Sequence, residues 1–145
     1  MRGRRERRKL GTVAFWSFET KALGPTPDAV APDGTAVRLL PSLAGGSFAH
    51  FELAAGAVSH VVAHRTVEEI WYFVVGSGEV WRRQGEIESV IAVGPGVSLT
   101  IPLGAHFQFR ADPSAPLAFV AATMPPWPGE GEAFAVEGRW RTTVP

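Results

Sequence analysis

The sequence predicts an all-β protein, a sandwich or barrel built from short strands. Sixteen glycines and twelve prolines interrupt the 145-residue chain too often for long helices. The segments between them are short, rich in Val, Phe and Trp, and often alternate between apolar and polar residues. Short alternating segments bounded by turn residues are typical of antiparallel sheets. A chain of this length can bury a core as a single domain.

The expected strands follow the chain in order and are separated by glycine and proline turns. They cover residues 13–18, 37–40, 47–53, 58–64, 69–75, 79–83, 90–93, 97–101, 106–110, 117–123 and 133–136. The turn Gly76-Ser77-Gly78 is expected to join its two neighbouring strands as a hairpin. The run EIWYFVV at 69–75 is apolar on both faces, which predicts a strand that is covered on both sides.

Composition narrows the possible classes of function. Cysteine is absent, which excludes disulfides, thiolate metal sites and cysteine nucleophiles. Residues 1–10 are strongly basic and predict a disordered tail, followed by a single domain over 11–145. We do not expect nucleic-acid binding, because no basic patch recurs downstream. No apolar run approaches the roughly 20 residues that span a bilayer. We therefore expect a cytoplasmic protein that does not enter a membrane.

One stretch concentrates metal-binding residue types. Alternation along the strand at 58–64 places His60, Val62 and His64 on one face, and Glu69 opens the next strand. If the inner faces of these strands meet, imidazole and carboxylate converge as ligands for zinc, iron, manganese or nickel. Without a metal, we expect His64 and Glu69 to hydrogen-bond, with the carboxylate raising the pKa of the histidine. Such a pair could act as polar anchors or as an acid and base.

The spacing of these residues resembles the motifs of the cupin superfamily. The first cupin motif contains His-x-His, three or four residues, Glu, six residues and Gly. Here His64 is followed by four residues and Glu69, then by six residues and Gly76. In the second motif a glycine precedes Pro-x-Gly, two residues and a histidine, and Gly96, Pro102 and Gly104 match its first part. The resemblance covers about residues 51–120.

The resemblance implies a small single-domain cupin, which folds as a double-stranded β-helix or jelly-roll barrel and forms a homodimer. It also implies a divalent metal, but two of the four ligand positions depart from the motif. Val62 and Phe107 stand where the family has histidines. His60, one alternation earlier, and His106, beside Phe107, are the candidate substitutes. A β-bulge at Gly104-Ala105 would be needed to turn His106 inward.

We expect a ligand pocket lined by His60, His64, Glu69, Trp71 and Phe107. Its metal site, if one forms, consists of His64 and Glu69 with His60 or His106, and the alternative is a pocket without metal. The expected function is binding of a small polar metabolite, with isomerase- or oxygenase-like chemistry. The alternative function is a non-catalytic binding or sensor module that has lost the metal. His50 is expected at the surface or the rim of the barrel. Trp127 and Trp140 are expected to fasten the C-terminal tail to the barrel, or to form a lid or a dimer contact.

Overall fold

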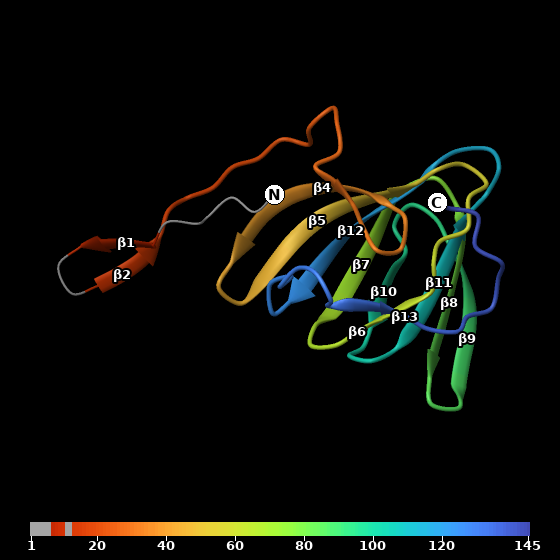
Figure 1. The fold of residues 1–145 in the computed structure, drawn as a ribbon. Coiled ribbons are helices and arrows are strands. Elements are labelled where there is room, and N and C mark those ends of the chain that lie inside the picture. Colours follow the sequence, from red (N-terminus) through yellow and green to blue (C-terminus); the bar gives the residue numbers. More distant parts are fainter. Residues whose placement is uncertain (1–6, 11–12) are drawn as a thin grey trace.

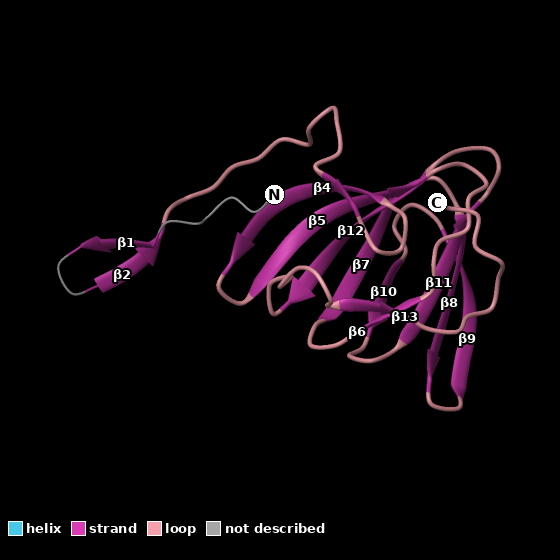
Figure 2. Cartoon of the chain, in the orientation of Figure 1, coloured by secondary structure: helices cyan, strands magenta, loops and turns pink. Residues whose placement is uncertain are grey.

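The computed structural model describes residues 7–10 and 13–145, which form strands, turns and loops without a helix (Figure 2). The all-β prediction is therefore confirmed. Within these residues no helix is long and apolar enough to cross a membrane. Most of the predicted basic tail, residues 1–6, lies outside the described part of the chain. Strand β1 (Arg7–Leu10) pairs with β2 (Val13–Trp16) in a hairpin that projects from the rest of the molecule (Figure 1).

Two antiparallel sheets form the body of the protein and face each other (Figure 1). The six-stranded sheet has the order β10-β7-β12-β5-β4-β3. Its strands are β3 (Ala29–Val30), β4 (Ala36–Leu43), β5 (Gly46–Leu53), β7 (Glu68–Val75), β10 (Ser98–Ile101) and β12 (Leu117–Met124). The five-stranded sheet has the order β13-β6-β11-β8-β9. Its strands are β6 (Val62–His64), β8 (Gly78–Gln84), β9 (Ile87–Val93), β11 (His106–Ala111) and β13 (Ala133–Ala135).

Aromatic side chains fill much of the space between the sheets. Trp71 stacks on Phe119 with ring centroids 4.0 Å apart, and it meets Phe107 edge-on at 5.3 Å. Phe73 and Phe109 complete this buried group. Large apolar rings supply most of the driving force for such a core because each removes a large apolar area from water. Trp71 and Phe107, which were expected to line the pocket, are both buried in this group.

The predicted hairpin at Gly76-Ser77-Gly78 is wrong. Strand β7 belongs to the six-stranded sheet and β8 to the five-stranded sheet, so this turn carries the chain from one sheet to the other. Gly76 has φ of 75°, in the left-handed region, and a Cβ there would collide with the carbonyl oxygen of Pro116. The glycine is needed for a crossover in which the backbone passes close to another segment. A two-strand pattern with a short turn does not distinguish a hairpin from this crossover.

Two expectations about burial are also wrong. The outer face of β7 is not covered, since Ile70 and Tyr72 are 49% and 50% exposed. The apolar residues on this face predicted that another segment would cover it, but the described residues leave it exposed to solvent. His50, expected at the surface, is buried on the outer face of β5 opposite Arg38 and Val120. The loop before β3 lies over this position, and Arg38 donates to the carbonyl oxygens of Gly24 and Pro25 there.

Candidate functional site

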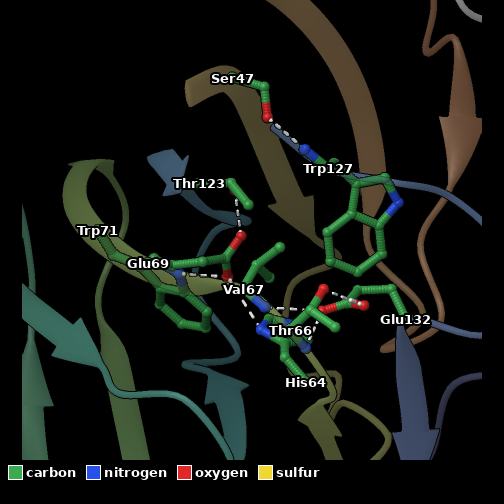
Figure 3. Close-up of polar contacts among 9 residues, drawn as sticks. All are labelled: Ser47, His64, Thr66, Val67, Glu69, Trp71, Thr123, Trp127 and Glu132. Atoms are coloured by element: carbon green, nitrogen blue, oxygen red, sulfur yellow. Dashed lines mark hydrogen bonds and ion pairs between the residues drawn. The ribbon is translucent and has the colours of Figure 1, made fainter. Parts of the chain in front are cut away.

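Glu69 is the centre of the polar group inside the barrel (Figure 3). It lies on β7 with its side chain only 5% exposed. Thr123 of β12 is its direct partner across the sheet, and the Thr123 hydroxyl donates to Oε2. Trp71, two residues further along the same face of β7, donates its indole N–H to Oε1 at 3.1 Å. Strand alternation and register thus bring two neutral donors to one buried carboxyl group.

His64 faces Glu69 from the opposite sheet. It lies at the end of β6, it is 5% exposed, and its Nδ1 is 3.9 Å from Oε1 of Glu69. That distance is too long for a hydrogen bond, and Nδ1 has no other hydrogen-bond partner. The rings of Phe107 and Trp127 meet the imidazole edge-on, each with centroids 5.2 Å away. The sequence prediction that His64 and Glu69 converge inside the fold agrees with this placement.

A carboxylate from the C-terminal segment fixes the turn between His64 and Glu69 (Figure 3). Glu132 accepts hydrogen bonds from the backbone N–H groups of Thr66 and Val67, at 2.6 and 2.8 Å, and from the Thr66 hydroxyl at 2.8 Å. Burial raises the pKa of Glu132, but these hydrogen bonds outweigh it and hold the pKa below 4.5. The ionised side chain therefore anchors the β6–β7 turn, which sets the separation of the two site residues.

Burial shifts both site residues toward their neutral forms. It raises the pKa of Glu69 from 4.5 to about 7, against the hydrogen bonds from Thr123 and Trp71, and the charges of Asp33 and Glu132 raise it further. Burial also lowers the pKa of His64 from 6.5 to about 4, although the charge of Glu132 acts in the other direction. The expectation that a carboxylate raises the pKa of His64 is therefore wrong, because desolvation dominates.

A cavity of about 1200 Å³ opens beside this pair. Its inner wall contains His64, Glu69 and Thr123, together with the rings of Trp71 and Phe119. Strands β3, β4 and β5 form one side of it, and residues 17–21 and 126–133 pass along its rim. Ligand cavities in proteins commonly combine apolar walls with a few convergent polar groups, and this cavity has that composition.

His60 does not join the pair. Its Nε2 lies 2.8 Å from the carbonyl oxygen of Pro145, and its Nδ1 lies 3.2 Å from the Thr142 hydroxyl. It lines a separate cavity of about 500 Å³ beneath the C-terminal segment. The expected strand at 58–64 is shorter than predicted, since only Val62–His64 is a strand and Val58 makes an isolated bridge to Arg110. The alternation that would have aligned His60 with His64 is therefore interrupted.

His106 is also directed away from the site. Its Nδ1 lies 3.3 Å from the Arg83 guanidinium, whereas Phe107 and Phe109 point into the core. No bulge at Gly104-Ala105 interchanges these faces, because β11 pairs with β8 in continuous register. Gln108, on the same face as His106, is buried under the C-terminal segment and accepts from the backbone N–H groups of Arg139 and Trp140. Trp140 thus helps to fasten the tail, which is one of the roles expected for it.

The residues in the barrel do not fit a divalent metal site. His64 and Glu69 are two donors, both oxygens of Glu69 already accept hydrogen bonds, and the other two motif positions are the buried apolar side chains of Val62 and Phe107. Among the described residues no group of three or more His, Cys, Asp or Glu side chains is arranged to hold a metal ion. A structural or catalytic site for zinc or a similar metal normally has at least three protein ligands. We therefore derive no chemical step through a metal.

The sequence did not identify Thr123 or Glu132 as residues of the site, and it gave Trp127 only as a tail fastener, a lid or a dimer contact. Thr123 was recognisable in principle, because alternation along β12 places Phe119, Ala121 and Thr123 on one face. Trp127 and Glu132 come from the irregular segment after β12, where no periodicity predicts which side chains turn inward. Their positions depend on long-range contacts to Ser47 and to the β6–β7 turn.

The comparisons with known proteins establish the fold. No family model and no curated protein sequence matches this chain. Many solved structures do match, and the protein has the cupin-type double-stranded β-helix fold that its motifs resemble. Sequence identities to the matched structures given below are under 20%, so the likeness concerns the fold alone.

Three matches illustrate the range of proteins that share this fold. A mutant of oxalate decarboxylase from Bacillus subtilis matches with a TM-score of 0.66 and 15% identity over 83% of this chain. CapF with the inhibitor 3-isopropenyl-tropolone matches at 0.63 and 14% over 76%. This chain spans about a third of the length of either protein, at 34% of each. Peruvianin-I, a cysteine peptidase from Thevetia peruviana latex, matches at 0.64 and 17%, covering 77% of this chain and 72% of that one.

Proposed function

We propose that the protein binds a small molecule in the cavity between its two sheets, with His64, Glu69 and Thr123 at the polar end. The observation that carries the proposal is a buried polar group placed at the inner wall of an aromatic cavity of about 1200 Å³. A protein gains little stability from burying an acid and an imidazole that do not hydrogen-bond to each other. Ligand recognition is the simplest reason for placing them there.

The polar end supports recognition by hydrogen bonding. Near neutral pH, Glu69 exchanges between its protonated and ionised forms, so it can donate or accept. Thr123 and Trp71 hold its two oxygens in fixed positions. The surrounding apolar rings exclude water and so strengthen each hydrogen bond that a ligand makes there.

An isomerase-like proton transfer is the second candidate function. It is favoured by the pKa of Glu69, about 7, which is the range in which a carboxyl group exchanges protons efficiently at neutral pH. Glu69 would take a proton from one carbon of the bound ligand and return it to another, and neutral His64 would polarise the ligand. The oxygenase-like chemistry that the cupin resemblance implies requires a metal or redox cofactor, and the donor set supports no step through one.

A neutral fluorescent probe tests cavity binding. N-phenyl-1-naphthylamine should fluoresce on binding to the wild-type protein at one molecule per chain. Ala49 lines the cavity, so Ala49→Phe should fill the space and weaken binding by at least about tenfold through steric exclusion. Ala92→Phe, which adds the same bulk on the exposed strand β9, is the matched control. Equal binding by wild type and Ala49→Phe would rule out the cavity as the site.

The predicted homodimer remains a prediction. The uncovered apolar face of β7, which includes Ile70 and Tyr72, is consistent with it because a second chain would bury this surface.

A further inference from the structure

We propose that the ligand of this cavity is an organic cation, an ammonium compound with an aromatic or aliphatic body. This inference rests on the proposed function and narrows it to a class of ligand. Acidic side chains predominate on the cavity wall, which includes Asp33, Glu69 and Glu130. Lys21, at the rim, is the only lysine among the described lining residues, and these include no arginine. A carboxylate or phosphate ligand would meet like charges and few cations there.

Glu69 lacks a cationic partner. Its hydrogen-bond donors, Thr123 and Trp71, are both neutral, and the described residues place no lysine or arginine in an ion pair with it. His64 lines the same wall, and its Nδ1 has no hydrogen-bond partner. Because burial keeps His64 neutral above about pH 4, it does not balance the carboxylate. A buried carboxylate without a counter-ion is unfavourable, and a bound ammonium group would supply that counter-ion.

Asp33 adds a second buried acid to the wall. It is 7% exposed, and one of its oxygens, Oδ1, accepts from the backbone N–H and the hydroxyl of Thr35, at 3.0 and 2.6 Å. Its own carbonyl oxygen accepts from the backbone N–H of His60, so its position is fixed. Burial raises the pKa of Asp33 above its ordinary 3.8, and its negative charge, when it is ionised, raises the pKa of Glu69, so each carboxyl group disfavours the ionisation of the other. A cation bound near both groups would favour their ionised forms and would be attracted to each of them.

The aromatic walls suit the same class of ligand. Phe51 stacks on Phe119 with ring centroids 5.2 Å apart, and Trp71 also stacks on Phe119, at 4.0 Å. Trp127 lines the cavity from the C-terminal side. Ring faces attract cations electrostatically, and the attraction strengthens where water is excluded. Apolar rings and acidic groups around one space therefore favour a cation with an apolar body over an anion.

Three compounds with the same ring system test the charge preference. Tryptamine is a cation, tryptophol is neutral and indole-3-acetate is an anion. We expect isothermal titration calorimetry at about pH 8, above the pKa of Glu69 near 7, to rank tryptamine tightest, by at least about tenfold over tryptophol. Indole-3-acetate should bind most weakly of the three. Glu69→Gln should lose about tenfold in affinity for tryptamine and less for tryptophol, whose hydroxyl group can still hydrogen-bond to the glutamine amide.

Two further variants keep the test decisive. Glu68→Gln removes the same charge from an exposed position one residue away and should leave tryptamine binding unchanged. If Glu69→Gln does not fold, Asp33→Asn should weaken tryptamine selectively, since its Oδ1 can still accept from Thr35. Equal or tighter binding of tryptophol or indole-3-acetate would overturn the cation inference while leaving cavity binding intact. Absence of tryptamine binding would also overturn it, whereas the neutral fluorescent probe tests the cavity independently.

Discussion

Replacing Glu69 with glutamine tests the electrostatics of the site through the pH dependence of folding. Burial raises the pKa of Glu69 from 4.5 to about 7, so between these pH values the folded protein holds a proton that the unfolded chain releases. Stability is then highest below pH 4.5 and falls as the pH rises. At 1.36 kcal/mol per pKa unit, the contribution of Glu69 to the free energy of unfolding falls by about 3 kcal/mol from pH 4.5 to about 7. Glu69→Gln removes this dependence.

His64 has the opposite effect over nearly the same range. Burial lowers its pKa from 6.5 to about 4, so the unfolded chain binds a proton that the folded protein does not. Its contribution to the free energy of unfolding therefore rises by about 3 kcal/mol between about pH 4 and pH 6.5. The two contributions nearly cancel in the wild-type protein. Each single variant should reveal the slope that the other residue produces.

Urea unfolding from about pH 4 to pH 8 measures both slopes. The free energy of unfolding of Glu69→Gln, relative to wild type, should rise by about 3 kcal/mol between pH 4.5 and 7. For His64→Phe, which keeps a ring at this position, the same difference should fall by about 3 kcal/mol between about pH 4 and 6.5. Glu68→Gln is the control for loss of an exposed carboxylate. Difference curves that are flat for both site variants would refute the buried, neutral pair.

Three further outcomes follow from the structure. Glu132→Gln should lower the free energy of unfolding by about 2 kcal/mol in urea titrations, because the charged group that accepts from Thr66 and Val67 is lost. A change below about 0.5 kcal/mol would contradict the anchoring role. Gly76→Ala should destabilise the protein by more than about 2 kcal/mol, and clearly more than the control Gly85→Ala, whose added Cβ would meet open space. Equal thermal midpoints for the two variants would contradict the close approach of the backbone at Gly76. Elemental analysis of protein purified without chelating resin should find sub-stoichiometric divalent metal, in an amount that His64→Ala does not change. Stoichiometric metal in the wild type that is lost in His64→Ala would contradict the poor fit of the donors.

Much of the fold was predictable because strand periodicity and turn residues act locally. The strand expected at 117–123 is β12, the strand expected at 106–110 is β11, and inward alternation correctly placed Phe107 in the core. The motif spacing at His64, Glu69 and Gly76 predicted the cupin-type fold. Sheet membership was less predictable, since the glycines at 76–78 suit both a hairpin and a crossover between sheets.

The site was predictable only in part, for physical reasons that differ between residues. His64 and Glu69 lie on strands that follow one another along the chain but belong to opposite sheets, so inward alternation on both strands was enough to bring them together. His60 lies where backbone pairing is interrupted, and its contacts come from residues more than 80 positions away. Glu132 reaches the site from an irregular segment. The pKa of His64 is lowered by burial, whereas the sequence predicted that a carboxylate would raise it. Desolvation depends on the whole surrounding core and not on the sequence neighbours.

A crystal structure with N-phenyl-1-naphthylamine bound would test the central claim most directly. We predict electron density for the naphthalene ring between the two sheets, against Trp71 and Phe119, with the amine directed toward Glu69. Density for the probe only on the exposed outer face of β7, beside Ile70 and Tyr72, with the cavity free of it, would contradict the assignment of the barrel interior as the ligand site.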